Sequence, residues 1–270
     1  MSNYICKTCG IQYAETGGPP DHCLICEDER QYVGWGGQQW TTLDDLRTDH
    51  HNIVENEGSN LTYIQTNPAF AIGQCARLIQ TPSGNVLWES ISFIDSETIK
   101  AVEQLGGISA IAVSHPHFYS SVVEWSQAFG GVPIYMHASD SRWLMRPDPA
   151  IIQWEGETFS LGEDLTLIRC GGHFDGSSVL HWASSADGKA ALLTGDTLYV
   201  VPDLQHVSFM RSYPNHIPLC ASKVRHIVEA VEPFRFDRIY SSWPERVIMS
   251  DGNSVVQRSA ERYIQAISEA

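Results

Sequence analysis

Positive charge is scarce in this sequence of 270 residues. It contains 17 Lys and Arg against 32 Asp and Glu, which gives a formal charge of −15. Because the phosphate backbone attracts cations, this balance argues against a nucleic-acid-binding function. The acidic excess favours solubility and does not point to a substrate.

Long apolar runs, a secretory leader and nucleotide-binding loops are also lacking. No segment approaches the roughly 18 consecutive apolar residues that a membrane-spanning helix needs, and no basic region followed by an apolar core opens the chain. Neither Gly-x-Gly-x-x-Gly nor a Walker loop occurs. The seven cysteines are an odd number and cannot all pair within one chain. Since free thiols persist in a reducing compartment, we expect a cytoplasmic protein with no membrane partner.

The patterning of apolar residues predicts an α/β fold. Apolar runs bounded by turn signals predict strands over 76–80, 85–89, 108–113, 132–136, 165–169, 178–182, 190–193 and 238–240. Apolar residues at helical spacing predict helices that begin near 41–46 and span 96–105, 121–129, 218–231 and 255–267. Ser96 is the expected cap of the helix over 96–105. The alternation of strands and helices indicates crossover units and a sheet covered by helices.

Four of the seven cysteines lie in the first 26 residues, in two C-x2-C pairs: Cys6 with Cys9, and Cys23 with Cys26. Two such turns can direct four thiolates at one ion, which zinc or iron accepts. Two redox pairs are the alternative. The segment 4–13 resembles the rubredoxin-like zinc-ribbon knuckle of rubrerythrins, which implies iron or zinc. We favour a closed, structural zinc site, because iron needs an electron partner that nothing here supplies. We expect residues 1–38 to form this ribbon and its linker, and residues 39–270 to form a larger domain.

Histidines and a carboxylate follow three of the predicted strands. His115 and His117 come after the run 108–113, His173 after 165–169, and Asp196 after 190–193. Residues at neighbouring strand ends can converge on one metal ion at an edge of the sheet. These residues resemble the motifs of metallo-β-lactamase-fold hydrolases, and the resemblance covers roughly residues 60 to 250. It implies an αββα sandwich and a metal site made by His115, His117, His173 and Asp196.

The chain departs from the family pattern at three positions. Tyr119 and Ser120 replace an Asp-His pair, and Trp243 lies near the place of a final histidine. Those missing residues would hold a second metal in dinuclear members, so we expect one active-site ion, with zinc favoured. Tyr119 is expected either to stabilise an oxyanion or to fill the vacated second site. Trp243 and Trp143 would make the pocket wall apolar.

The expected function is therefore zinc-dependent hydrolysis of a small-molecule ester, lactone, thioester or related bond. Three histidines with an open position lower the pKa of a zinc-bound water to about 7, and Asp196 can orient that water or act as general base. Two alternatives stay open. One is a regulatory metal-binding protein that has lost catalysis. The other is a redox protein related to flavodiiron enzymes, although these need carboxylates where the chain has His117 and Tyr119.

Overall fold

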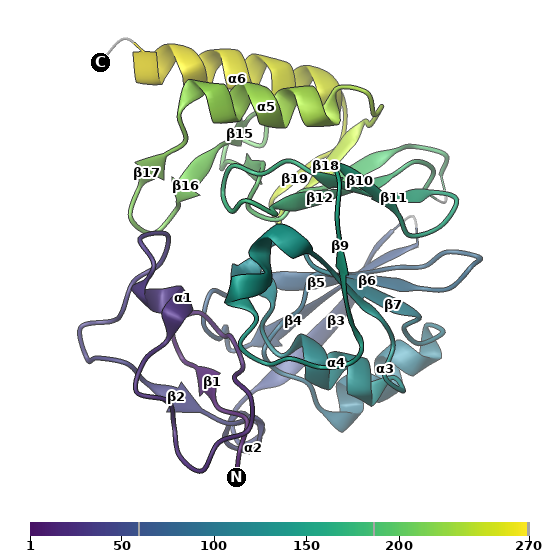
Figure 1. Ribbon diagram of the computed structural model, residues 1–270. Helices are drawn as coiled ribbons and strands as arrows, with labels where there is room; N and C mark the ends of the chain where they lie inside the picture. The colour runs from purple at the N-terminus through teal and green to yellow at the C-terminus, as the bar shows by residue number, and fades with distance from the viewer. Residues whose placement is uncertain (59, 186, 269–270) are drawn as a thin grey trace. The chain divides into compact units, whose positions relative to one another are not determined.

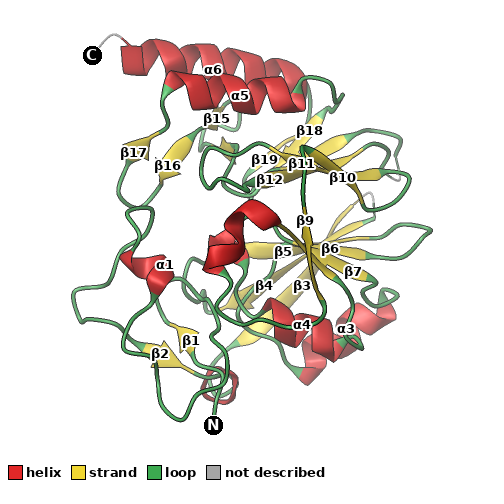
Figure 2. Ribbon diagram, viewed as in Figure 1, coloured by secondary structure: helices red, strands yellow, loops and turns green. Residues whose placement is uncertain are grey.

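The computed structural model describes residues 1–58, 60–185 and 187–268 (Figure 1). The chain divides into two compact units. The first unit comprises residues 1–136 and 141–153, and the second comprises residues 137–140 and 154–270. Strands and helices occur in both, as expected for an α/β protein (Figure 2). No helix of the described residues combines the length and the hydropathy needed to cross a membrane.

A seven-stranded sheet is the main element of the first unit. Its strands follow chain order: β3 (His51–Gly58), β4 (Leu61–Asn67), β5 (Cys75–Ile79), β6 (Val86–Trp88), β7 (Ala110–Ala112), β8 (Ile134–His137) and β9 (Ile151–Trp154). Pairing is antiparallel from β3 to β6 and parallel from β6 to β8. The parallel strands are joined through the helices α3 (Ser96–Gln104) and α4 (Val122–Ala128). This crossover region carries the loop with His115 and His117.

The N-terminal ribbon belongs to the first unit. It contains β1 (Ile5–Cys6) and the single-turn helix α1 (Leu24–Glu27), and β1 pairs with β2 (Trp40–Thr41), which directly follows the ribbon. Helix α2 (Leu43–Leu46) follows, with Thr42 and Asp45 forming a capping box. Ile5 of the ribbon shares a buried cluster with Leu46 and Phe93. The ribbon therefore packs on the rest of its unit instead of standing apart.

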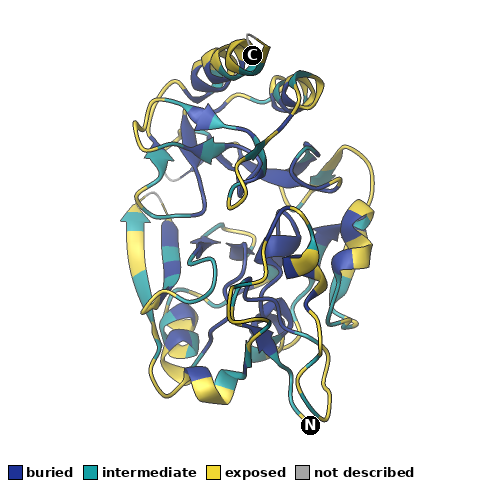
Figure 3. Cartoon of the chain, turned by 90° about the vertical axis from the view of Figure 1, so that its left-hand side faces the viewer, coloured by how far each residue is buried: buried dark blue, intermediate teal, exposed yellow. Residues whose placement is uncertain are grey.

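A six-stranded sheet forms the second unit, in the order β10 (Thr158–Ser160), β11 (Leu165–Arg169), β12 (Ser178–Trp182), β13 (Ala191–Leu193), β18 (Arg238–Tyr240) and β19 (Val247–Ile248). Helices α5 (Ala221–Val231) and α6 (Gly252–Ser268) pack side by side near it. Both helices bury one face and expose the other (Figure 3). Two small hairpins complete the unit: β14 (Tyr199–Val200) with β15 (Val207–Ser208), and β16 (Met210–Ser212) with β17 (Ile217–Pro218).

Most predicted elements are confirmed, with shifted ends. The predicted helix over 218–231 begins at Ala221, and the cap of α3 is Asp95, not Ser96, because the Asp95 carboxylate accepts the Thr98 N–H at 2.8 Å. The hairpin of β3 and β4 was not predicted. Its outer strand mixes polar and apolar residues and is only partly buried, so it lacks the apolar run of a core strand.

We expect Ile227→Ala to destabilise the second unit by about 2–5 kcal/mol, because it leaves a cavity in a packed core. Ile227 is fully buried in the cluster between α5, α6 and the sheet. Urea denaturation followed by circular dichroism measures the change. Glu229→Ala, at an exposed position of the same helix, is the control and should change stability by less than about 0.5 kcal/mol. Equal effects of the two changes would contradict the assigned core.

Candidate metal centres

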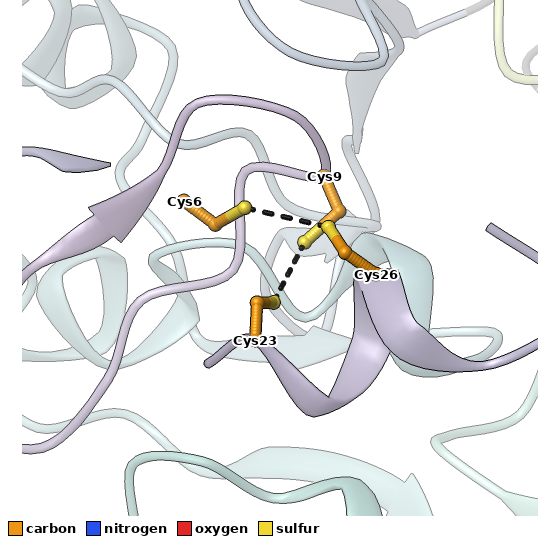
Figure 4. A group of neighbouring side chains, drawn as sticks. All are labelled: Cys6, Cys9, Cys23 and Cys26. Atoms are coloured by element: carbon orange, nitrogen blue, oxygen red, sulfur yellow. Dashed lines mark hydrogen bonds between the residues drawn. The ribbon is translucent and has the colours of Figure 1, made fainter. Parts of the chain in front are cut away.

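The four N-terminal cysteines converge on one point (Figure 4). Cys6 ends β1 and Cys9 lies in the turn after it, while Cys23 caps α1 and Cys26 lies within that helix. All four side chains are buried, and their sulfur atoms lie within 4.8 Å of one another. The Cys6–Cys26 and Cys9–Cys23 sulfur pairs are 3.5 and 3.6 Å apart. The structure thus brings together every cysteine that the two C-x2-C motifs indicated.

This geometry fits a tetrahedral metal ion. Zinc bound at about 2.3 Å from each sulfur separates the sulfurs by about 3.8 Å. Hydrogen bonding from Cys23 lowers the pKa of Cys6, which favours the thiolate form that metals bind. Gln38 Nε2 also donates to the Cys6 sulfur at 3.1 Å. The group therefore matches a zinc ribbon at the N-terminus.

The first turn of the ribbon is held by its own backbone. The Gly10 N–H donates to the Cys6 carbonyl at 2.9 Å, and the Cys6 N–H donates to the Ile11 carbonyl at 3.0 Å. Gly10 has φ +81°, a conformation that a side chain rarely adopts. These bonds fold the segment between the two sulfurs into the tight turn that directs both at one ion.

His115 and His117 lie on the loop after β7, at the start and middle of the 3₁₀ turn Pro116–Phe118. Both side chains are buried, with ring centroids 5.2 Å apart. Burial, aided by the Arg30 guanidinium, lowers the pKa of His115 to about 3. The ring is therefore neutral at physiological pH, which is the form that binds metals. The Ser114 hydroxyl lies 2.7 Å from His115 Nδ1 and fixes the ring orientation.

Glu89 is a site residue that the sequence analysis missed. It follows β6 with φ +68°, is 1% exposed, and accepts the Ser114 N–H at 3.1 Å. Its carboxylate thereby holds the backbone immediately before His115. The available signal was a carboxylate at the end of the apolar run 85–88, the same pattern that pointed to Asp196.

His173 and Asp196 lie together in the second unit. His173 Nε2 is 3.9 Å from Asp196 Oδ2, and both side chains are buried. His173 Nδ1 donates to the Met210 carbonyl at 2.9 Å. Metal-binding histidines commonly use one ring nitrogen for such a bond and the other for the ion. Gly172, with φ +85°, permits the turn before His173, because a Cβ there would lie 2.8 Å from Ile227 Cδ1.

Asp196 carries the electrostatic signature of a functional carboxylate. Burial raises its pKa to about 6, and the charge of His173 offsets this only in part. A shift caused by desolvation beside a charged partner is characteristic of functional sites. The Asp196 carboxylate is the form that a nearby cation would stabilise.

An aromatic group surrounds this pair. The Tyr213 hydroxyl donates to the Asp196 carbonyl at 3.1 Å, and the Tyr213 ring lies 6.0 Å from that of His173. Tyr199 contacts both Tyr213 and Trp243, at centroid distances of 4.9 and 5.3 Å. Trp243 was expected in a pocket wall, whereas the two tyrosines were not singled out. Trp143, in the first unit, packs beneath the guanidinium groups of Arg30 and Arg142.

Three further residues, Tyr119, Asp175 and His216, differ in how far they are buried. Tyr119 is buried at the end of the 3₁₀ turn, in the first unit. Asp175, two residues after His173, has an exposed side chain, and Asp140 accepts the Gly176 N–H of that loop at 3.0 Å. His216 is exposed at the turn between β16 and β17.

A protein of Bacillus subtilis (strain 168), the uncharacterized protein YmaE, is 50% identical over 270 residues, which cover 99% of this chain and 98% of YmaE. No family model matches the chain. Among solved structures, VMB-1 aligns with a TM-score of 0.60 at 11% identity, covering 80% of this chain and 98% of VMB-1. The mono-zinc form of the metallo-β-lactamase FIM-1 from Pseudomonas aeruginosa aligns with a TM-score of 0.57 at 13% identity, covering 79% and 96%. This likeness shows that the chain has the metallo-β-lactamase fold.

Removing metal from the four-cysteine group should unfold the ribbon, because so short a segment buries little apolar surface without it. After chelation, or in Cys26→Ser, we expect rapid protease cleavage within residues 1–39 while the six-stranded sheet stays protected. Mass spectrometry of the fragments identifies the sites. Cys220→Ser, at an exposed thiol, is the matched control. Unchanged cleavage in Cys26→Ser would rule out a metal-stabilised ribbon.

The raised pKa of Asp196 predicts a pH effect on the metal-free protein. Because the folded state retains a proton that the unfolded chain loses between about pH 4 and pH 6, the free energy of unfolding falls as pH rises through that window. Asp196→Asn removes this dependence. The free energy of unfolding of the variant, minus that of the wild type, should therefore increase by about 2–3 kcal/mol from about pH 4 to about pH 7. Urea denaturation in the presence of a chelator measures these free energies of unfolding. Asp175→Asn, at an exposed position of the same unit, is the control. A pH-independent difference for Asp196→Asn would contradict the prediction.

Proposed function

Because the chain belongs to the same family as the Bacillus subtilis protein YmaE and has the metallo-β-lactamase fold, we propose that it is a metal-dependent hydrolase. In this proposal one catalytic ion, zinc being favoured, is bound by His115, His117 and His173, and Asp196 either acts as a fourth ligand or holds the attacking water. The four-cysteine group holds a second, structural ion. The substrate is a small molecule with an ester, lactone, thioester or related bond.

The proposal rests on the burial of these four side chains and on the ligand atoms that they offer. Each offers one ligand atom from a buried side chain. His115 and His173 each have Nδ1 within hydrogen-bond distance of a partner, Ser114 Oγ and the Met210 carbonyl respectively, and these contacts fix the orientation of the two rings. Buried imidazoles held in this way, together with a buried carboxylate, form a donor set that suits zinc.

Zinc bound by neutral histidines would lower the pKa of a bound water to about 7 and would polarise a substrate carbonyl. The Asp196 carboxylate would orient the attacking water or accept its proton. The Tyr119 hydroxyl would donate to the developing oxyanion, or else its ring fills the place of a second ion. The aromatic group of Tyr199, Tyr213 and Trp243 favours a substrate with an apolar or aromatic part.

A single catalytic ion follows from the residues that replace the second-site ligands. Ser120, at the position of a family histidine, has its hydroxyl engaged by Gln74 Nε2 at 3.1 Å. Trp243 offers an aromatic ring that packs on Tyr199. FIM-1, which shares the fold, has been crystallised in a mono-zinc form.

Metal analysis and hydrolysis assays of His173→Ala test the proposal. We expect about two ions per chain in the wild type and about one in the variant, because removing a ligand empties the catalytic site and spares the cysteines. Hydrolysis across a panel of esters, lactones and thioesters should fall by at least about 100-fold.

His216→Ala, at an exposed histidine of the same unit, is the matched control and should retain both ions and activity. Three ions per chain would contradict the mononuclear site. Activity that survives His173→Ala would contradict the mechanism. Two ions without activity on any substrate would favour a regulatory metal-binding protein.

A further inference from the structure

We propose that the N-terminal ribbon holds the loop that carries His115 and His117 in place through a set of contacts, which we call the brace. Metal binding at the four cysteines would thereby raise the metal affinity of the catalytic site. The inference rests on the proposed function in taking these histidines as ligands. The bracing itself is carried by contacts within the first unit. The residues that make it are Gly10 and Gln12 of the ribbon, and Ser92 and Ser120 of the larger domain.

The first contact joins the turn after Cys9 to the segment that follows Glu89. Ser92 Oγ donates to the Gly10 carbonyl at 2.8 Å. The approach is so close that a Cβ at Gly10 would lie 2.5 Å from Ser92 Oγ and 3.2 Å from Ala71 Cβ. Only glycine is therefore accommodated here, both for space and for its φ of +81°. Nearby, Ile5 packs on Phe93 in a buried cluster.

The second contact reaches the histidine loop itself. The Gln12 N–H donates to the Ser120 carbonyl at 3.0 Å, three residues after His117. Ser120 has φ +40°, which is unfavourable for a residue with a side chain and needs support from its surroundings. The support comes from this bond and from Gln74, whose Nε2 donates to Ser120 Oγ at 3.1 Å and to the Ser90 carbonyl at 3.0 Å.

A polar network extends the contact to α4, the helix that follows the loop. Gln12 Nε2 donates to Glu124 Oε1 at 3.2 Å, and Arg146 donates to both Gln12 Oε1 and Glu124. The space enclosed by Ile11, Gln12, Tyr119 and their neighbours amounts to about 10 Å³, no more than a single water fills. The ribbon and the loop are thus closely packed against each other.

The cysteine site controls this brace because Gly10 and Gln12 belong to its first turn. The Gly10 N–H and the Ile11 carbonyl both bond Cys6, so the positions of Gly10 and Gln12 follow the fold of the turn. A ribbon with two-residue strands has little stability of its own. If metal at the cysteines orders the ribbon and the ordered ribbon favours the binding form of the loop, each metal must raise the affinity for the other.

The resemblance places a second-metal histidine at the position of Ser120. In this chain Ser120 contacts the ribbon instead, through its backbone carbonyl.

Ser92→Ala in the full-length, metal-loaded protein tests the brace, because it removes the bond to Gly10 and keeps all eight proposed ligands. We expect faster amide exchange in residues 114–122, measured by mass spectrometry, and zinc affinity at the histidine site lowered on the order of 10-fold in a chelator competition. Cobalt(II) reports the two sites separately, since only thiolate ligands give strong charge-transfer absorption. Cys9→Ser should produce the same two effects more strongly.

Ser126→Ala is the matched control: it also deletes a buried hydroxyl that donates to a backbone carbonyl, that of Val132, in the same unit. It should lower thermal stability without altering loop exchange or zinc affinity. If Ser92→Ala behaves like Ser126→Ala, and Cys9→Ser leaves the loop unchanged, the brace does not exist. If the wild type binds no ion at the histidines, the proposed function fails, whereas loop exchange still decides whether the ribbon restrains the loop.

Discussion

The free-energy cost of burying ionisable side chains is the constraint on which both candidate centres depend. Desolvation raises the pKa of Asp196 to about 6 and lowers that of His115 to about 3. Both shifts disfavour the charged form. A bound cation would offset the desolvation cost of the Asp196 carboxylate. The neutral imidazole of His115 is already in the form that binds a cation. The four cysteines are also buried, with their sulfur atoms within 4.8 Å of one another, so metal binding and folding stability are coupled at each centre.

The two units position their proposed ligands by different means. In the first unit, side chains position the proposed ligand: Glu89 holds the backbone before His115, and Ser114 fixes the ring of His115. In the second unit, the backbone does it, through glycines in the left-handed conformation before His173 and a carbonyl that accepts its Nδ1 proton. Side-chain support can be changed by one substitution at a time, whereas the glycine turn depends on the packing of α5 as well.

Local patterns in the sequence were sufficient for most of the apolar core strands and longer helices, and for naming the candidate ligands. The strands β11 and β12 coincide with the predicted runs, because a buried strand needs apolar residues along its length. What could not be predicted depends on contacts between distant segments. Ser92 and Gly10 are 82 residues apart and carry no motif. Glu89 was assigned to the end of a strand because its positive φ, which ends that strand, is not visible in the spacing.

The outer strand of the first sheet has a consequence for association between molecules. Strand β3 is the outermost strand of its sheet in the described part of the chain, and the backbone of an outer strand can be joined by a strand of another molecule. Glu55 is exposed on this strand, in a protein that already carries a charge of −15. Two such edges would bring carboxylates near carboxylates, and this repulsion opposes edge-to-edge aggregation.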